Sequence, residues 1–137
     1  MFAEYDYSQF PIVNVILHNI ENEDDFNSFL DEWLKLYIRE EDFTFIFDTR
    51  KVHKAPLKYS IRMSEFIKQL KKDYSYHYLK KSIILVSNNL VKNMLNGIFK
   101  LQSPVAPVYL ISDITDIDLI LNDNFKNNKN IKLIKPN

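Results

Sequence analysis

The chain has 137 residues, of which 46% are hydrophobic and 14% aromatic, enough for one domain with its own hydrophobic core. It contains no cysteine and one glycine, which excludes thiol catalysis, thiolate metal sites, disulfides and the glycine-rich phosphate-binding loops. The formal net charge of zero argues against a dedicated nucleic-acid-binding protein.

The charges are segregated along the chain. Residues 1–48 carry twelve acidic and two basic side chains, whereas residues 50–102 carry twelve basic and two acidic ones. This pattern indicates either opposed surface potentials that guide a partner or self-association, or two regions that meet in the fold and neutralise each other. Because no apolar run approaches the roughly 20 residues that span a bilayer, and the N-terminus has acids where a signal peptide needs bases, we expect a soluble cytoplasmic protein.

The first predicted elements are two strands and a helix. Apolar residues at Val13, Val15 and Leu17 alternate and predict a strand, with residues 2–7 as a paired edge strand before it. Asn22 and Asp25 resemble a capping box. The helix that follows has apolar residues at helical spacing, namely Phe26, Phe29, Leu30, Trp33, Leu34 and Tyr37.

Strands and helices alternate through the rest of the chain. Short apolar runs predict buried strands at 43–47, 82–86 and 107–111, with helices starting near Pro56, after Asn88 and at Asp113. The last of these helices would carry Ile114, Ile117 and Leu121. This alternation predicts an α/β fold with a mixed, mostly parallel sheet and crossover helices. We expect one domain at 1–121 and a polar tail at 122–137, in which 131–134 would add a short strand.

Three segments resemble known families. IFDTRKV (46–52) resembles the strand of STAS domains, the anti-sigma-factor antagonist fold, that ends in Asp and leads to a functional loop. YLKKSIILVSNNLVKNMLNGIF (78–99) resembles a strand–helix segment of Sec14-like (CRAL-TRIO) lipid-binding domains, and SPVAPVYLI (103–111) resembles the link to their next strand. The resemblance implies a STAS/Sec14-like fold and a non-enzymatic protein-interaction or regulatory role.

Two departures limit what this resemblance implies. Leu57 and Lys58 stand where bacterial STAS antagonists carry the phosphorylatable serine, and Ser60 falls inside the predicted helix, so the phosphorylation switch does not carry over. Only residues 102–107 occupy the place where Sec14-like proteins have a sizeable gate, so a closed lipid pocket is not expected.

Candidate binding residues follow the predicted strands, because open α/β sheets bind ligands beyond the carboxyl ends of their strands. The candidates are Asp48, Thr49, Arg50, Lys51, His53, Lys54, Lys58, Ser87, Asn88 and Ser112. The basic ones surround a helix start, which suits a phosphate, an acidic peptide or a lipid headgroup. The alternative is a loop of solvated lysines in which Asp48 and Asn88 act as helix caps.

The residues favour a binding module over an enzyme. The three histidines lie far apart, and no serine stands in a nucleophile elbow, so we predict no catalytic residue, metal or cofactor. The leading hypothesis is a non-enzymatic module that binds a protein partner or itself. The alternative is a binder of a lipid or small anionic ligand, or of a membrane surface, through the basic loop 50–58. A catalytic role for Asp48 or His53, and binding of nucleic acid, rank last.

Overall fold

Strands that are neighbours in the sheet are also consecutive in the sequence. The computed structural model describes residues 1–125 and 128–137. They form a six-stranded sheet in the order β1-β2-β3-β4-β5-β6. The strands are β1 (Ala3–Gln9), β2 (Ile12–Leu17), β3 (Phe43–Asp48), β4 (Leu79–Leu85), β5 (Val108–Ile111) and β6 (Lys132–Ile134). Strands β2 to β5 are parallel, and β1 and β6 pair antiparallel at the two edges. The predicted α/β class with a mixed, mostly parallel sheet is confirmed.

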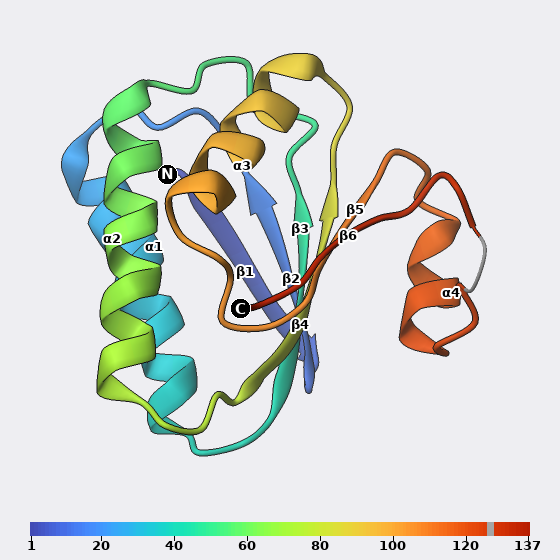
Figure 1. Ribbon diagram of the computed structural model, residues 1–137. Coiled ribbons are helices and arrows are strands. Elements are labelled where there is room, and N and C mark those ends of the chain that lie inside the picture. Colours follow the sequence, from blue (N-terminus) through green and yellow to red (C-terminus); the bar gives the residue numbers. More distant parts are fainter. Residues whose placement is uncertain (126–127) are drawn as a thin grey trace.

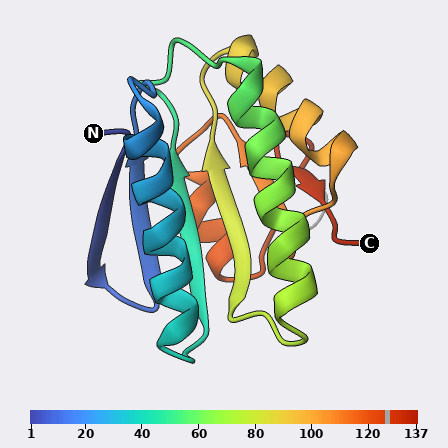
Figure 2. The same cartoon turned by 90° about the vertical axis from the view of Figure 1, so that its left-hand side faces the viewer.

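Three long helices cover one face of this sheet. They are α1 (Glu23–Ile38), α2 (Leu57–Asp73) and α3 (Asn89–Leu101), and the short α4 (Asp116–Leu121) lies on the other face (Figures 1 and 2). Right-handed crossovers that step in one direction along a sheet place their helices on the same face. Helix α4 instead joins β5 to its antiparallel neighbour β6. Among the described residues, no helix has both the length and the apolar character that a membrane crossing needs.

The helix starts follow local capping chemistry. The Asn22 side chain accepts a hydrogen bond of 2.9 Å from the Asp25 N–H and caps α1, as the sequence predicts. The start predicted for the last helix is wrong by a few residues. The Asp113 side chain accepts bonds from the backbone and hydroxyl of Thr115, which holds this segment as a turn and leaves Ile114 exposed.

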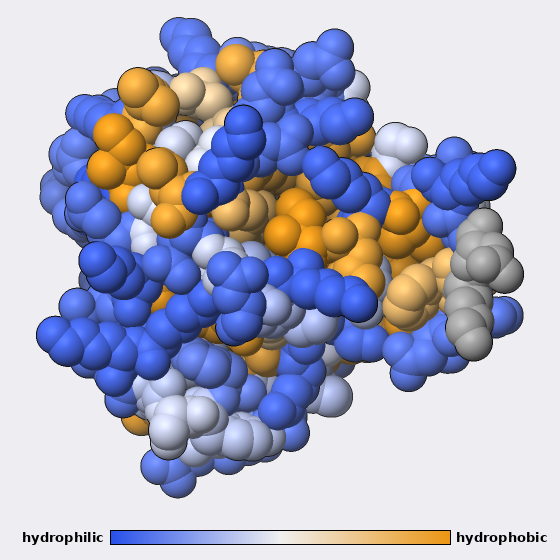
Figure 3. Space-filling model, in the orientation of Figure 1, coloured by the Kyte–Doolittle hydropathy of each residue, from blue (hydrophilic) through white to orange (hydrophobic). Residues whose placement is uncertain are grey.

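The main core lies between the sheet and helices α1 to α3. Alternate residues of β3, namely Phe43, Phe45 and Phe47, point to this side, and the Trp33 ring packs against Phe45 with centroids 4.9 Å apart. A smaller apolar cluster lies under α4 and consists of Ile83, Leu85, Tyr109, Ile111 and Ile120. Apolar atoms also show at the surface between α3 and α4 (Figure 3).

Part of the segregated charge is neutralised inside the fold. Glu23 of α1 forms ion pairs with Lys58 and Arg62 of α2, at 2.9 and 2.7 Å. Asp42 lies 3.9 Å from Lys80, another pair between the acidic and basic regions. The acidic first third of the chain therefore neutralises part of the positive charge of the basic middle, because α1 and α2 lie side by side on the sheet (Figure 2).

Candidate functional site

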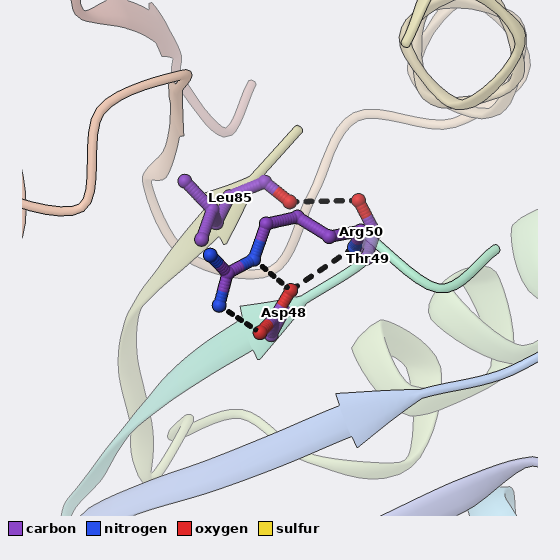
Figure 4. A network of polar contacts seen from close by, with 4 residues as sticks. All are labelled: Asp48, Thr49, Arg50 and Leu85. Carbon is purple, nitrogen blue, oxygen red and sulfur yellow. Dashed lines mark hydrogen bonds and ion pairs between the residues drawn. The ribbon is translucent and has the colours of Figure 1, made fainter. Parts of the chain in front are cut away.

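Asp48 and Arg50, two of the predicted binding residues, form an ion pair with each other at the end of β3. The Arg50 guanidinium donates from Nε and Nη2 to the two carboxylate oxygens of Asp48, at 3.0 and 2.8 Å (Figure 4). The backbone N–H of Arg50 donates to the same carboxylate at 3.0 Å. These hydrogen bonds, chiefly that of the Arg50 side chain, lower the pKa of Asp48. Asp48 therefore does not cap α2, and Arg50 already has a carboxylate partner within the chain.

Thr49 has a structural position. Its side chain is buried, and its hydroxyl donates to the Leu85 carbonyl at 2.7 Å (Figure 4). The Thr49 backbone N–H donates to the same carbonyl at 3.1 Å. These two bonds tie the end of β3 to the end of β4, so Thr49 holds the sheet edge together and presents no polar atom to solvent.

The basic loop after Thr49 is held by asparagine side chains. The Asn19 side-chain oxygen accepts from the N–H groups of His53 and Lys54, at 2.7 and 3.1 Å. The Asn88 side-chain nitrogen donates to the Val52 carbonyl at 3.1 Å. With the backbone fixed in this way, the side chains of Lys51, His53 and Lys54 are exposed. Lys58, the remaining basic candidate, differs from these three because its ammonium group forms an ion pair with Glu23.

A pocket lies beside this loop, at the carboxyl ends of β4 and β5. Its volume is about 350 Å³. The predicted residues Ser87, Asn88 and Ser112 line it, but the loop 50–58 does not. Asn89, which also follows the strand and is a further candidate from the sequence, lines it as well. The polar lining is completed by residues that the sequence does not single out, namely Lys92, Lys129, Asn130 and Lys132. Lys92 could have been found, because it lies within one turn of the predicted helix start. The sequence places Lys129 and Lys132 in the predicted tail, and they reach the pocket because β6 pairs with β5.

The pocket is electropositive. Lys92, Lys129 and Lys132 are among its lining residues, and no carboxylate is found among those that the structure describes. The Lys132 ammonium donates to the Asn96 side-chain oxygen at 3.0 Å, outside the lining. It also lies at the N-terminus of α3, where the helix dipole is positive, and the first turn of α3 has no acidic residue. The Asn88 side chain caps this helix by accepting from the Val91 N–H at 2.9 Å. This arrangement suits an anionic group.

Within residues 1–125 and 128–137, no three or more His, Asp or Glu side chains come together in an arrangement that could hold a metal ion. The structure also keeps apart the three histidines. His18 contacts Glu4 at 2.7 Å, His53 lies on the basic loop, and His77 contacts Tyr37 at 2.8 Å.

Comparisons with protein families, with curated proteins and with solved structures find no significant match for this chain.

Proposed function

We propose that the chain is a non-enzymatic binding module that takes up an anionic group at the carboxyl end of its sheet. The observation that supports this is the pocket at the start of α3, whose lining combines Lys92, Lys129 and Lys132 with serine and asparagine residues. Convergent positive charge at a helix N-terminus attracts anions and lowers the free energy of the bound state. The likeness to STAS and Sec14-like domains supports a binding role in place of a catalytic one.

The dimensions of the pocket favour a small ligand. A volume of about 350 Å³ falls within the range of small-molecule sites. The ligand is a carboxylate- or phosphate-bearing molecule, because the lining residues include lysines and two serines, Ser87 and Ser112, whose side chains are hydrogen-bond donors suited to anionic oxygens.

Titration with small anions tests this function. Inorganic phosphate and citrate are added to the isotopically labelled protein, and backbone amide signals are followed by NMR. We expect saturable shifts at Ser87, Asn89 and Ser112, and roughly tenfold weaker binding in Lys92→Glu, which replaces an attractive charge with a repulsive one.

Lys100→Glu is the matched control, because Lys100 is exposed on the last turn of the same helix, at its other end. It makes the same charge change to the whole protein without altering the pocket. Equal weakening by the two substitutions would mean that the anions respond only to net charge, and the proposal would then be abandoned.

Association with a protein partner is a second candidate, and the surface around the basic loop favours it. Leu57, at the start of α2, is 73% exposed, next to the exposed Lys51 and Lys54. Apolar atoms show over the N-terminal part of α2 (Figure 3). An exposed apolar residue close in sequence to exposed lysines suits an acidic segment with an apolar anchor.

A labelled hexaglutamate peptide that contains one leucine is the probe for this second candidate. We expect Lys51→Glu combined with Lys54→Glu to abolish the anisotropy change on binding, and added salt to weaken it. Binding that is unchanged in this double variant would rule out the loop surface and leave the pocket as the recognition site.

A further inference from the structure

Strand β1 forms one edge of the sheet, with α1 beside it (Figure 2). Within residues 1–125 and 128–137, β1 pairs with β2 alone. It has seven residues, whereas β6 at the opposite edge has three. An open edge strand presents unpaired backbone N–H and C=O groups that a further strand can bind. β1 is therefore a place at which another chain can extend the sheet.

The β1–β2 ladder shows which backbone groups are unpaired. The Phe2 carbonyl accepts a hydrogen bond of 2.7 Å from the His18 N–H, just outside the two strands. Hydrogen-bonded pairs alternate along antiparallel strands, so Glu4 is the next residue whose backbone groups face β2. The backbone N–H and C=O groups of Ala3 and Tyr5 consequently point away from β2, towards the open edge.

A groove lies beside this edge, between β1 and α1, and its volume is about 560 Å³. Tyr5 and Tyr7 line it from β1, with their rings stacked at a centroid distance of 5.9 Å. Ser28 and Phe29 line it from α1. Because successive side chains of a strand point to opposite faces, every second side chain of an added strand would lie over this groove.

The charge of the groove is negative. Glu4, Asp25 and Glu32 line it, and apart from the Met1 amine no positive group is found among its lining residues that the structure describes. The Met1 amine lies 3.4 Å from Asp25, and the Lys35 ammonium lies 3.4 Å from Glu32. Exposed pairs of this kind contribute little free energy, so they leave the carboxylates available to a cation from outside.

This charge also decides against a second copy of the chain as the added strand. Glu4 and Asp6 are exposed on the face of β1 that points away from the aromatic rings. If two copies paired through their β1 strands, these four carboxylates would lie on adjoining strands, where like charges destabilise the pairing. A basic strand at the same place would instead gain attraction from them.

We propose that β1 accepts an extended, basic segment of a partner protein as an additional strand, with lysine or arginine side chains over the groove. The aliphatic stems of these side chains pack on Tyr5 and Tyr7, and their charged ends reach Asp25 and Glu32. The groove shares no lining residue with the electropositive pocket. Strand addition is therefore independent of anion binding and goes beyond it.

Hydrogen exchange at single amides tests this proposal. A peptide in which lysine alternates with valine over the length of β1 is added to the isotopically labelled protein, and exchange is followed by NMR. We expect the Ala3 and Tyr5 amides to exchange roughly tenfold more slowly when the peptide is bound, because they gain acceptors. The Glu4 amide should change little, because β2 already pairs it. A peptide held by charge alone would not produce this alternation.

Two further peptides separate the backbone from the charge. The fully N-methylated peptide keeps the lysine charges but donates no backbone hydrogen bond, and it should lose the binding. A peptide in which glutamate alternates with valine keeps the backbone and reverses the charge, and it should not bind either. Equal binding by either of them would overturn the proposal. So would protection of Ala3 and Tyr5 that rises with protein concentration in the absence of peptide, because that result would assign the edge to a second copy.

A matched pair of substitutions on α1 locates the peptide. Glu32→Gln removes a charge from the groove and keeps an oxygen for the Tyr7 hydroxyl, which donates to Glu32 at 2.5 Å. Asp31→Asn removes the same charge from an exposed position outside the groove. We expect roughly fivefold weaker binding in Glu32→Gln and almost none of that loss in Asp31→Asn. Equal effects would mean that the peptide responds only to net charge, and the groove would be excluded as its site.

Discussion

At the scale of single residues, a histidine contact couples the fold to pH. The Tyr37 side chain is buried, and its hydroxyl lies 2.8 Å from Nδ1 of His77. The Nδ1 atom of a neutral His77 can accept a hydrogen bond from the Tyr37 hydroxyl. The pKa of His77 is lowered from 6.5, first by burial and then by the charges of Lys71 and Lys80. The unfolded chain therefore binds a proton at His77 more readily than the folded chain does.

The lowered pKa of His77 predicts that acid destabilises the protein before its carboxylates titrate. Well above pH 6.5 His77 is neutral in both the folded and the unfolded state and adds no pH dependence. As the pH falls through 6.5 towards the lower folded pKa, the unfolded state gains its proton first, so the free energy of unfolding decreases. Urea denaturation at neutral and mildly acidic pH measures this slope. His77→Gln should flatten it, and an unchanged slope in that variant would assign the effect to other groups.

At the scale of elements, one asparagine positions two parts of the candidate site. The Asn88 side-chain oxygen caps α3, and its nitrogen holds the Val52 carbonyl of the basic loop. Asn22 caps α1 through Asp25. The two caps differ in what else the side chain binds. Asn88 also donates to Val52, which lies in a loop distant in sequence, so it joins the start of α3 to another part of the fold.

Replacing the two caps should separate these contributions. We expect Asn22→Ala to cost about 1 kcal/mol, the usual loss of an N-cap, and Asn88→Ala about 2 kcal/mol because the bond to Val52 is lost as well. Asn88→Asp should fall between wild type and Asn88→Ala, since it keeps the capping oxygen and loses the donor. Urea denaturation of the four proteins tests this order, and equal losses for both alanine variants would show that the Val52 bond contributes nothing.

At the scale of the whole molecule, the sheet separates a large core from a small one. Phe45 is fully buried in the large core against Trp33 and Phe43, whereas Ile120 is fully buried in the small cluster under α4. A unit with few buried apolar contacts opens more readily than the rest of a protein. Helix α4 and β6 form the edge of the molecule and should therefore open before the central strands do.

Hydrogen exchange distinguishes the two cores. Phe45→Ala should lower the global free energy of unfolding by about 3–5 kcal/mol and accelerate exchange throughout the sheet. Ile120→Ala should accelerate exchange in α4 and β6 first and leave β2 and β3 close to wild type. Uniform acceleration in Ile120→Ala would instead show that the chain unfolds as one cooperative unit, with the small cluster as part of it.

The sequence by itself determined the elements whose signals are local. The helical spacing from Phe26 to Tyr37, the buried run of β3 and the cap at Asn22 all depend on neighbours within a few residues, so they could be predicted. Only the tertiary structure decided the candidate sites. Arg50 is neutralised by Asp48, and Lys129 and Lys132 come to the start of α3 because β6 returns along β5. Such contacts depend on how distant segments pack, and no local pattern in the sequence records that packing.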